Sequence, residues 1–251
     1  MEKTFSFLKK FNILVGLILL IQGFIMLWKS TNFSLPITSS YLKFDPVTQT
    51  LNPVLDQVTK MQIGPLVASF LLLSALALLA ITLPGIFDWY VKNLKKGINY
   101  ARWIEYSVTS SLMIVVISML VGIYDIASLL LIFCINTTMI LFGWMMELHN
   151  QTTKKTNWTP FIFGSFAGLI PWIVITIYLI GAGSGVPNFV YWIYGSLFVF
   201  FNIFAINMIL QYKKIGPWED YIYGEKVYIV LSLVAKSLLA WQVFFGTLRP
   251  M

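Results

Sequence analysis

The sequence predicts an all-α membrane protein, a bundle of seven transmembrane helices that forms a single domain over residues 1–251. The chain is 58% hydrophobic and 11% charged, whereas soluble domains carry about 25% charged residues. Apolar runs of roughly 20 residues, the length that crosses a bilayer, fill nearly all of it. We therefore expect a multi-pass protein of the cell membrane, surrounded by lipid, with no room for a soluble catalytic domain.

The apolar runs place the spans and leave one long loop. Residues 29–62 are polar and contain three prolines, and within them Tyr41–Leu51 carries β-branched and aromatic side chains. This pattern predicts a short β-hairpin on the membrane surface. The expected spans are Phe11–Trp28, Gly64–Ile86, Gly97–Val121, Ile126–Leu148, Trp158–Ile180, Phe189–Tyr212 and Lys226–Phe245.

The distribution of basic residues predicts the orientation of the chain. Twelve lysines and arginines fall on the side of the N-terminus and four, including Arg249, on the other. Cytoplasmic loops carry the excess of positive charge, so we expect a cytoplasmic N-terminus, an extracellular C-terminus and an extracellular hairpin. The net charge of +7 lies in short clusters beside the spans, which excludes nucleic acid as the expected partner.

One charged residue stands inside the last span. Lys236 lies near the middle of Tyr228–Phe245, which is otherwise uncharged, and an ammonium at this depth costs at least about 3 kcal/mol. A desolvated lysine becomes a nucleophile towards carbonyl groups. We therefore interpret Lys236 as the residue that forms a Schiff base with an aldehyde.

Glu105 in the third span is the expected partner of this lysine. Lys236 is ten residues past Lys226 and Glu105 is eight past Gly97, or about 15 and 12 Å along parallel helices at 1.5 Å per residue. The two side chains are thus at similar depth, and the carboxylate would balance the charge of the imine. The alternative is a buried ion pair that only fixes the packing of the two helices.

Several neighbours share these helix faces. Ser232 is four residues before Lys236, and Thr109 is four after Glu105, although such hydroxyls often bond only their own backbone. Arg102 is three before Glu105, and we interpret it as a positive anchor at the cytoplasmic surface rather than a site residue. Other acids, such as Glu147, fall at helix ends, where solvated roles are expected.

Aromatic residues inside the spans could line an apolar cavity. Trp172 and Phe201 are two of them, and either could wall a flat apolar ligand or simply pack in the core. A further pattern, Gly164 to Gly168, has small residues four apart, which permits close helix approach. That pattern fits either a homodimer face or a contact within one bundle.

At this point the chain resembles the retinal-binding rhodopsins. The stretch from Arg102 to Thr109, RWIEYSVT, is similar to the third-helix pattern of microbial rhodopsins, R-[YW]-x-[DE]-[WY]-x-x-T. The predicted cytoplasmic N-terminus and the serine at position 232, where ordinary members carry a second carboxylate, match the heliorhodopsins instead. The long first loop and the residues around Lys236 agree with that family.

The resemblance implies all-trans-retinal on Lys236 as a protonated Schiff base, with Glu105 as its counterion. It further implies that residues of the fourth and sixth helices touch the chromophore or its polar surroundings, namely Asn136, Met139, Gly143 and Phe201. Heliorhodopsins are regarded as dimeric light sensors without robust pumping, so a homodimer and an unidentified cytoplasmic signalling partner are expected. The histidines that many members carry near the site are replaced here by Gln22 and Leu78.

Two other classes of function remain open from the sequence. A light-driven ion pump or channel would use the same chromophore. A small transporter could use the Glu105–Lys236 pair directly, but it would be expected to show inverted repeats or broken helices, and none is clear. An enzyme would need clustered nucleophiles, bases or metal ligands, which are not evident, so we expect no enzymatic activity.

Overall fold

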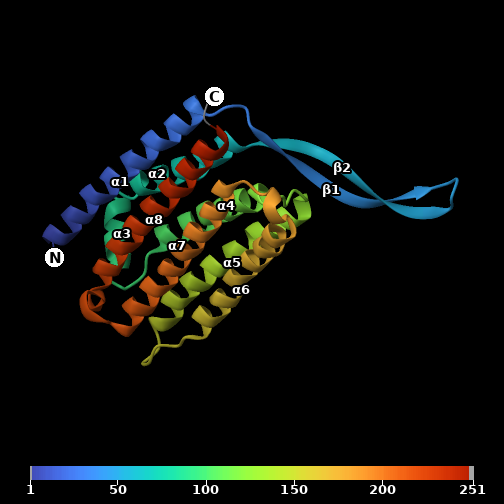
Figure 1. Cartoon of the computed structure of the whole chain (residues 1–251). Helices are drawn as coiled ribbons and strands as arrows, with labels where there is room; N and C mark the ends of the chain where they lie inside the picture. The colour runs from blue at the N-terminus through green and yellow to red at the C-terminus, as the bar shows by residue number, and fades with distance from the viewer. Residues whose placement is uncertain (1, 249–251) are drawn as a thin grey trace.

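The computed structural model describes residues 2–248, which form a helical bundle with one long β-hairpin (Figure 1). Seven helices in this part of the chain are long and apolar enough to cross a membrane, which confirms the predicted fold class. Arg249, one of the basic residues in the orientation argument, lies outside the described residues. The long helices are α1 (Glu2–Lys29), α2 (Ile63–Ala80), α4 (Tyr100–Leu120), α5 (Ile126–Asn150), α6 (Thr159–Gly181), α7 (Asn188–Lys213) and α8 (Tyr221–Val243).

Most of the helices follow one another around the bundle. Helices α1, α2, α4, α5 and α6 pack in chain order, and α8 packs against both α7 and α1. The lipid-facing sides expose large apolar residues such as Leu131, Phe166 and Trp192. Exposed side chains of this kind suit a bilayer, because hydrocarbon tails solvate them as well as a protein core would.

The second span is shorter than the sequence predicted. Helix α2 ends at Ala80 rather than near Ile86, and Pro84 and Gly85 separate it from a short helix, α3 (Ile86–Leu94). Gly85 has a φ of 79°, a left-handed conformation that glycine adopts without a steric penalty. The bend lets α3 bury Tyr90 against the end of the bundle.

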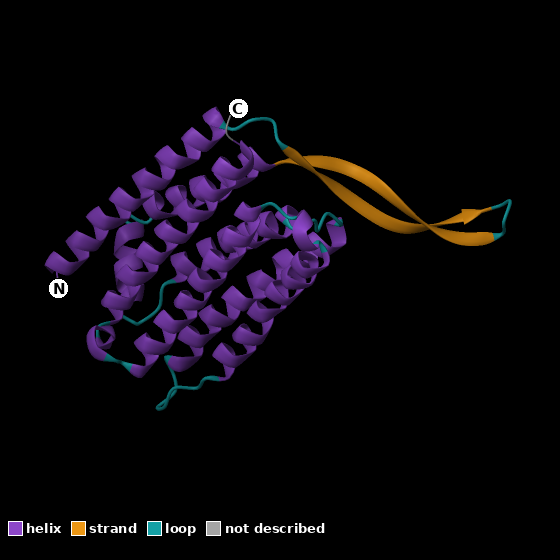
Figure 2. Cartoon of the chain, in the orientation of Figure 1, coloured by secondary structure: helices purple, strands orange, loops and turns teal. Residues whose placement is uncertain are grey.

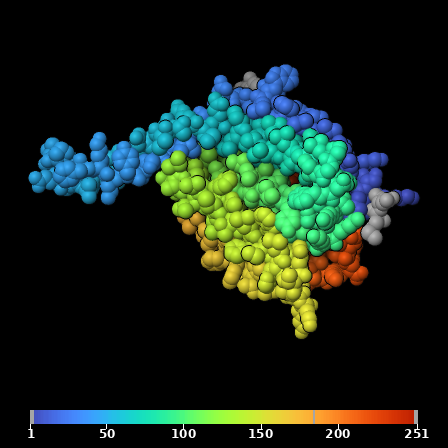
Figure 3. All heavy atoms as spheres, turned by 180° about the vertical axis from the view of Figure 1, so that it is seen from behind, coloured from blue at the N-terminus to red at the C-terminus, as the bar shows by residue number. Residues whose placement is uncertain are grey.

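The first loop is a hairpin, but it is neither short nor flat on the bundle. Strand β1 (Ser34–Asp45) pairs antiparallel with β2 (Thr50–Gln62), and twelve residues at about 3.4 Å each span about 40 Å. Figure 2 shows the two strands extending well beyond the helices, and Figure 3 shows the same projection from behind. At the tip the Asp45 carboxylate accepts a hydrogen bond from the Val47 N–H (2.9 Å), which lowers the pKa of Asp45.

Side-chain caps fix where three of the long helices begin. Asn99 accepts a hydrogen bond from the Arg102 N–H at the start of α4, Asp125 from Ser128 at the start of α5, and Asp220 from Ile222 at the start of α8. Each cap satisfies a backbone donor that the first turn leaves free. The cap at Asn99 matters most for the site, because it sets the rotation of α4 and so the directions of Arg102 and Glu105.

Candidate functional site

Lys236 is buried in α8 and contacts the carboxylate that the sequence predicted. Its Nζ lies 2.9 Å from Glu105 Oε1 and 2.5 Å from Ser232 Oγ, and only 3% of the residue is exposed. The Tyr106 ring is 4.9 Å from the same nitrogen, within the range of a cation–π contact. The predicted pairing of α4 with α8 is therefore present, with the serine one helical turn before the lysine as the third member.

The Glu105 carboxylate is held by two further hydroxyls. Thr109 donates to Oε1 over 2.8 Å, as its spacing on α4 indicated, and Ser74 of α2 donates to the same oxygen over 2.5 Å. Hydrogen bonds to an ionised acceptor are short and strong, so these donors fix the position of the carboxylate. The sequence argument missed Ser74, because the residue lies in another span and no spacing connects it to Glu105.

A mostly apolar cavity begins at Lys236 and extends among α4, α5, α6, α7 and α8. The space free of protein atoms in and at the mouth of the cavity is about 870 Å³. The predicted residues Met139, Gly143, Phe201 and Ser232 line it together with Lys236. The wall also includes residues that the sequence did not single out, among them Trp103, Tyr106, Met113, Phe161, Phe204, Met208 and Tyr228.

Three of the predicted site residues stand behind this wall. Asn136 is buried and donates to the hydroxyls of Ser110 and Ser111, and Ser110 lines the cavity. Trp172 packs edge-on against Phe201, with ring centroids 5.5 Å apart, and so supports a lining residue without lining the cavity itself. Thr109 acts through its bond to Glu105.

The glycines of α5 and α6 serve packing within the bundle. A Cβ on Gly143 would lie 2.5 Å from the Trp103 ring, and one on Gly168 would lie against the Met139 side chain. A Cβ on Gly164 would meet Phe142 of α5 at 3.0 Å. The Gly164–Gly168 face is thus occupied by α5, so the interpretation of it as a homodimer face is wrong and its alternative, a contact inside one bundle, holds.

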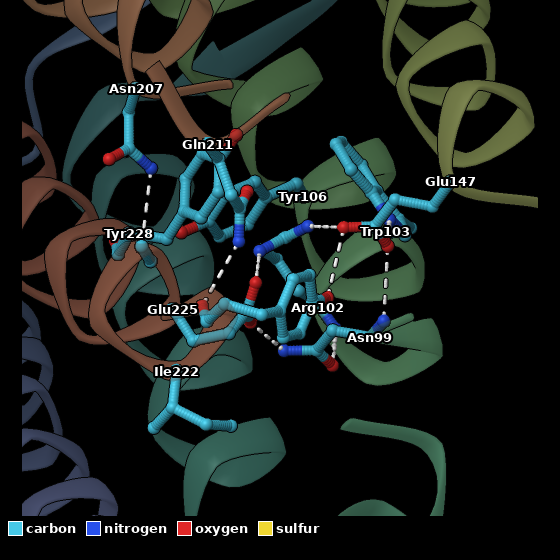
Figure 4. Close-up of polar contacts among 12 residues, drawn as sticks. Asn99, Arg102, Trp103, Tyr106, Glu147, Asn207, Gln211, Ile222, Glu225 and Tyr228 are labelled. Carbon is cyan, nitrogen blue, oxygen red and sulfur yellow. Dashed lines mark hydrogen bonds and ion pairs between the residues drawn. The ribbon is translucent and has the colours of Figure 1, made fainter. Parts of the chain in front are cut away.

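The structure also corrects the interpretation of Arg102 and Glu147. Arg102 is 6% exposed and Glu147 2% exposed, so neither is a solvated group at a helix end. Figure 4 shows the Arg102 guanidinium between Glu147 of α5 and Glu225 of α8, and it pairs with both carboxylates. Glu105 is therefore not the only carboxylate inside the bundle, contrary to the sequence argument.

The Arg102 cluster, defined here as Arg102, Glu147 and Glu225, joins three helices. The guanidinium also lies between two aromatic rings, 4.4 Å from the centroid of Trp103 and 3.9 Å from that of Tyr228. Buried charges are tolerated only when they are paired and hydrogen-bonded, and this cluster meets both conditions. It lies one turn of α4 away from Glu105, on the side where α4 and α8 begin.

A buried lysine–carboxylate pair at one end of an apolar cavity, inside seven apolar helices, defines a seven-helix membrane protein with a small-molecule site at a buried lysine. Comparison with solved structures supports the fold. The fold is similar to the crystal structure of a light-driven proton pump from Leptosphaeria maculans, with a TM-score of 0.66 over 97% of this chain and 94% of the other. The two sequences are 14% identical, so this likeness concerns the fold alone. No match was found among curated proteins.

A comparison with protein families identifies the family to which the chain belongs. The heliorhodopsin family matches residues 8–248, which is nearly the whole chain. The chain belongs to the heliorhodopsin family, as the motifs around Glu105 and Lys236 indicated. It is thus a multi-pass membrane protein of a family of retinal photoreceptors, and its family implies a retinal chromophore.

Proposed function

We propose that this protein is a light sensor that carries all-trans-retinal on Lys236 as a protonated Schiff base, with Glu105 as the counterion. The observation that carries the proposal is the Nζ–Oε1 distance of 2.9 Å between these two residues at the closed end of the cavity. In this position the lysine amine stands where the imine nitrogen would be. The Glu105 carboxylate is close enough to contact either the amine or the imine nitrogen.

The residues present fit the chromophore. The Lys236 amine is buried and lines the cavity, so an aldehyde in the cavity can reach its nitrogen. The cavity wall is apolar and rich in aromatic rings, which suits a polyene chain. Retinal, when bound, supplies the light-driven isomerisation, and the protein supplies the walls that restrict it.

The chain's own residues then have separate tasks. Glu105 keeps a proton on the nitrogen, because an anion at this distance in a low dielectric stabilises the cation strongly. Ser74 and Thr109 hold the carboxylate in place. Ser232 accepts a hydrogen bond from the nitrogen, in the position where a second carboxylate would otherwise compete for the proton.

We infer that light produces a conformational signal rather than net ion transport. A pump needs acceptor and donor groups on both sides of the nitrogen. The half of α4 beyond Thr109 reads from Ser110 to Leu120 without an ionisable residue, and Met113, Ile114, Val116 and Ile117 in it are buried apolar side chains. A proton that leaves the nitrogen has no evident relay along this face.

The same proposal covers topology and partners. A cytoplasmic N-terminus, supported by the distribution of basic residues, places the Arg102 cluster at the cytoplasmic end and the hairpin outside. A homodimer and a cytoplasmic signalling partner complete the proposed function. Such a partner would contact the loops at the cytoplasmic end.

The decisive test is whether the purified protein becomes coloured when all-trans-retinal is added. We expect a visible pigment in the wild type and none in Lys236→Ala, while Lys226→Ala on the same helix serves as the matched control and keeps the pigment. Glu105→Gln should shift the absorption to the red or give the deprotonated form. A bleachable pigment in Lys236→Ala, or an unchanged spectrum in Glu105→Gln, would contradict the assignment.

Transport is tested separately by illuminating liposomes that contain the pigment. We expect no sustained change of external pH and no steady photocurrent. A light-driven pH change that a protonophore abolishes would identify a pump, the function of the protein from Leptosphaeria maculans. A steady current at fixed voltage would identify a channel.

A further inference from the structure

A second, smaller chamber lies between the lysine site and the Arg102 cluster. Glu105 and Ser232 stand in its wall, as do Arg102 and Glu225, and Asn12 of α1 completes it from the side. Ser232 also lines the large cavity. The hydroxyl that accepts a hydrogen bond from Lys236 therefore stands at the junction of the two spaces.

Asn12 indicates that this chamber holds water. Its side chain is fully buried beside the Tyr90 hydroxyl, and neither its amide nitrogen nor its oxygen makes a hydrogen bond of good geometry with any residue of the described chain. A buried amide without partners costs about 1–3 kcal/mol, and ordered water normally satisfies such groups. Each water molecule needs roughly 10–15 Å³ of water-accessible volume, so the chamber has room for a short chain of two or three.

The cluster at the far end of the chamber carries an excess negative charge. Two carboxylates, Glu147 and Glu225, share one guanidinium, so the cluster as a whole can take up one proton and become neutral. Glu147 accepts from four donors, the Asn99 N–H, Arg102, Trp103 Nε1 and the Tyr221 hydroxyl. These four donors occupy the acceptor positions of its two oxygens.

Glu225 accepts fewer hydrogen bonds than Glu147, so its oxygens have acceptor positions left for a proton. It accepts from Arg102 and from the Asn99 amide over 2.6 Å, and it lines the chamber, as Glu147 does not. Tyr90 lines the same chamber, but burial and the nearby Glu225 raise its pKa, so its phenol stays protonated and has no role as an acceptor. Apart from the counterion Glu105, which the Lys236 nitrogen already contacts, Glu225 is thus the base in the chamber wall best placed to receive a proton.

We propose that Glu225 accepts, through water in this chamber, the proton that the Lys236 nitrogen carries in the dark. This rests on the proposed retinal linkage. The N–H bond breaks with its electron pair left on nitrogen, which becomes neutral, and an O–H bond forms on Glu225, which makes the Arg102 cluster neutral. The reverse transfer restores the dark state, so no proton is lost or gained across the membrane.

The distance suits a short water chain. Ser232 and Glu225 are seven residues apart on α8, or about 10.5 Å along the axis. Four hydrogen bonds of about 2.8 Å cover this span, which requires three water molecules. Asn12, with two donors and an acceptor lone pair unused, lies where it can hold one of them.

The test is light-induced infrared difference spectroscopy on pigments of the wild type, Glu225→Gln and Glu147→Gln. We expect the carbonyl stretch of a newly protonated carboxylic acid in the wild type and in Glu147→Gln, and its loss in Glu225→Gln. The proposal is overturned if the band is missing in the wild type, persists in Glu225→Gln, or is lost in Glu147→Gln instead. If no wild-type pigment forms, the proposed function itself has failed, which is a different result.

Asn12→Leu provides a second test that leaves the charges intact. The leucine has a similar volume but cannot anchor water, so the carboxylic acid band should rise more slowly by about tenfold, as expected for the loss of one bridging hydrogen bond. Unchanged kinetics would overturn the proposal even if Glu225→Gln did not fold. A high-resolution map of the dark state gives an independent readout, because water bonded to Asn12 is expected and a dry chamber would contradict the mechanism.

Discussion

Replacement of Arg102 by methionine tests whether the Arg102 cluster holds the bundle together. Methionine has a similar length but no charge, so Arg102→Met leaves Glu147 and Glu225 facing each other without their cation. The side chains of all three residues are at most 4% exposed, so water cannot compensate. Removal of one partner from a buried pair costs about 3–5 kcal/mol, to which the two ring contacts add about 0.5–2 kcal/mol each at most.

The lower ends of these ranges add up to a loss of roughly 4 kcal/mol, and at about 2–4 °C for each kcal/mol the unfolding midpoint should fall by about 10 °C or more. The assay is thermal unfolding of the retinal-free protein in detergent, followed by tryptophan fluorescence, so the result does not depend on pigment formation. Lys213→Met, at an exposed helix end, is the matched control and should stay within about 0.5 kcal/mol of the wild type.

A triple variant separates the charge effect from a general loss of packing. Arg102→Met combined with Glu147→Gln and Glu225→Gln should recover most of the lost stability, because a neutral replacement of a whole buried network is often tolerated. A midpoint for Arg102→Met equal to that of the Lys213→Met control would refute the reasoning. A triple variant no more stable than the single one would show that packing, not charge, is what Arg102 supplies.

Two further predictions concern the cavity and the topology. Gly143→Ala should slow or prevent pigment formation, because its Cβ would push the Trp103 ring, 2.5 Å away, into the cavity. Gly195→Ala, whose Cβ meets nothing within 4 Å, is the control, and normal pigment in Gly143→Ala would contradict the expectation. In intact cells, a cysteine at Ser6 should resist an impermeant thiol reagent and one at Ser40 should react, both positions being exposed; the opposite pattern would reverse the proposed orientation.

The fold was predictable because its main signals are local. Seven apolar runs and their polar boundaries depend on residues that are neighbours in the chain, and a bilayer imposes the helical form on each run. The hairpin was foreseen around Tyr41–Leu51, but its length was not. Outside the bundle, the pairing from Ser34 to Gln62 is set by cross-strand contacts rather than by composition, so the polar flanks looked like a loop.

The core of the site was predictable for a different reason. A lysine and a glutamate inside apolar spans stand out, because such residues are expensive there, and helical rise places Lys236 and Glu105 at equal depth. Ser74 has no such signal. A serine in a membrane helix usually bonds its own backbone, and the Ser74 hydroxyl lies within hydrogen-bond distance of the Phe70 carbonyl as well as of Glu105.

The Arg102 cluster was hidden by a small error at one helix boundary. The apolar pattern placed the start of the last span at Lys226, whereas α8 begins at Tyr221, so Glu225 seemed to lie outside the bundle. Arg102 and Glu225 are 123 residues apart in the chain, and a paired, buried charge near a helix end has the same composition as a solvated one. A paired charge and a solvated charge differ only in the side chains that other helices place beside them, and those depend on tertiary packing. The same packing brings Asn12 of α1 to the chamber, so the groups proposed to move the proton are those that no local pattern marks.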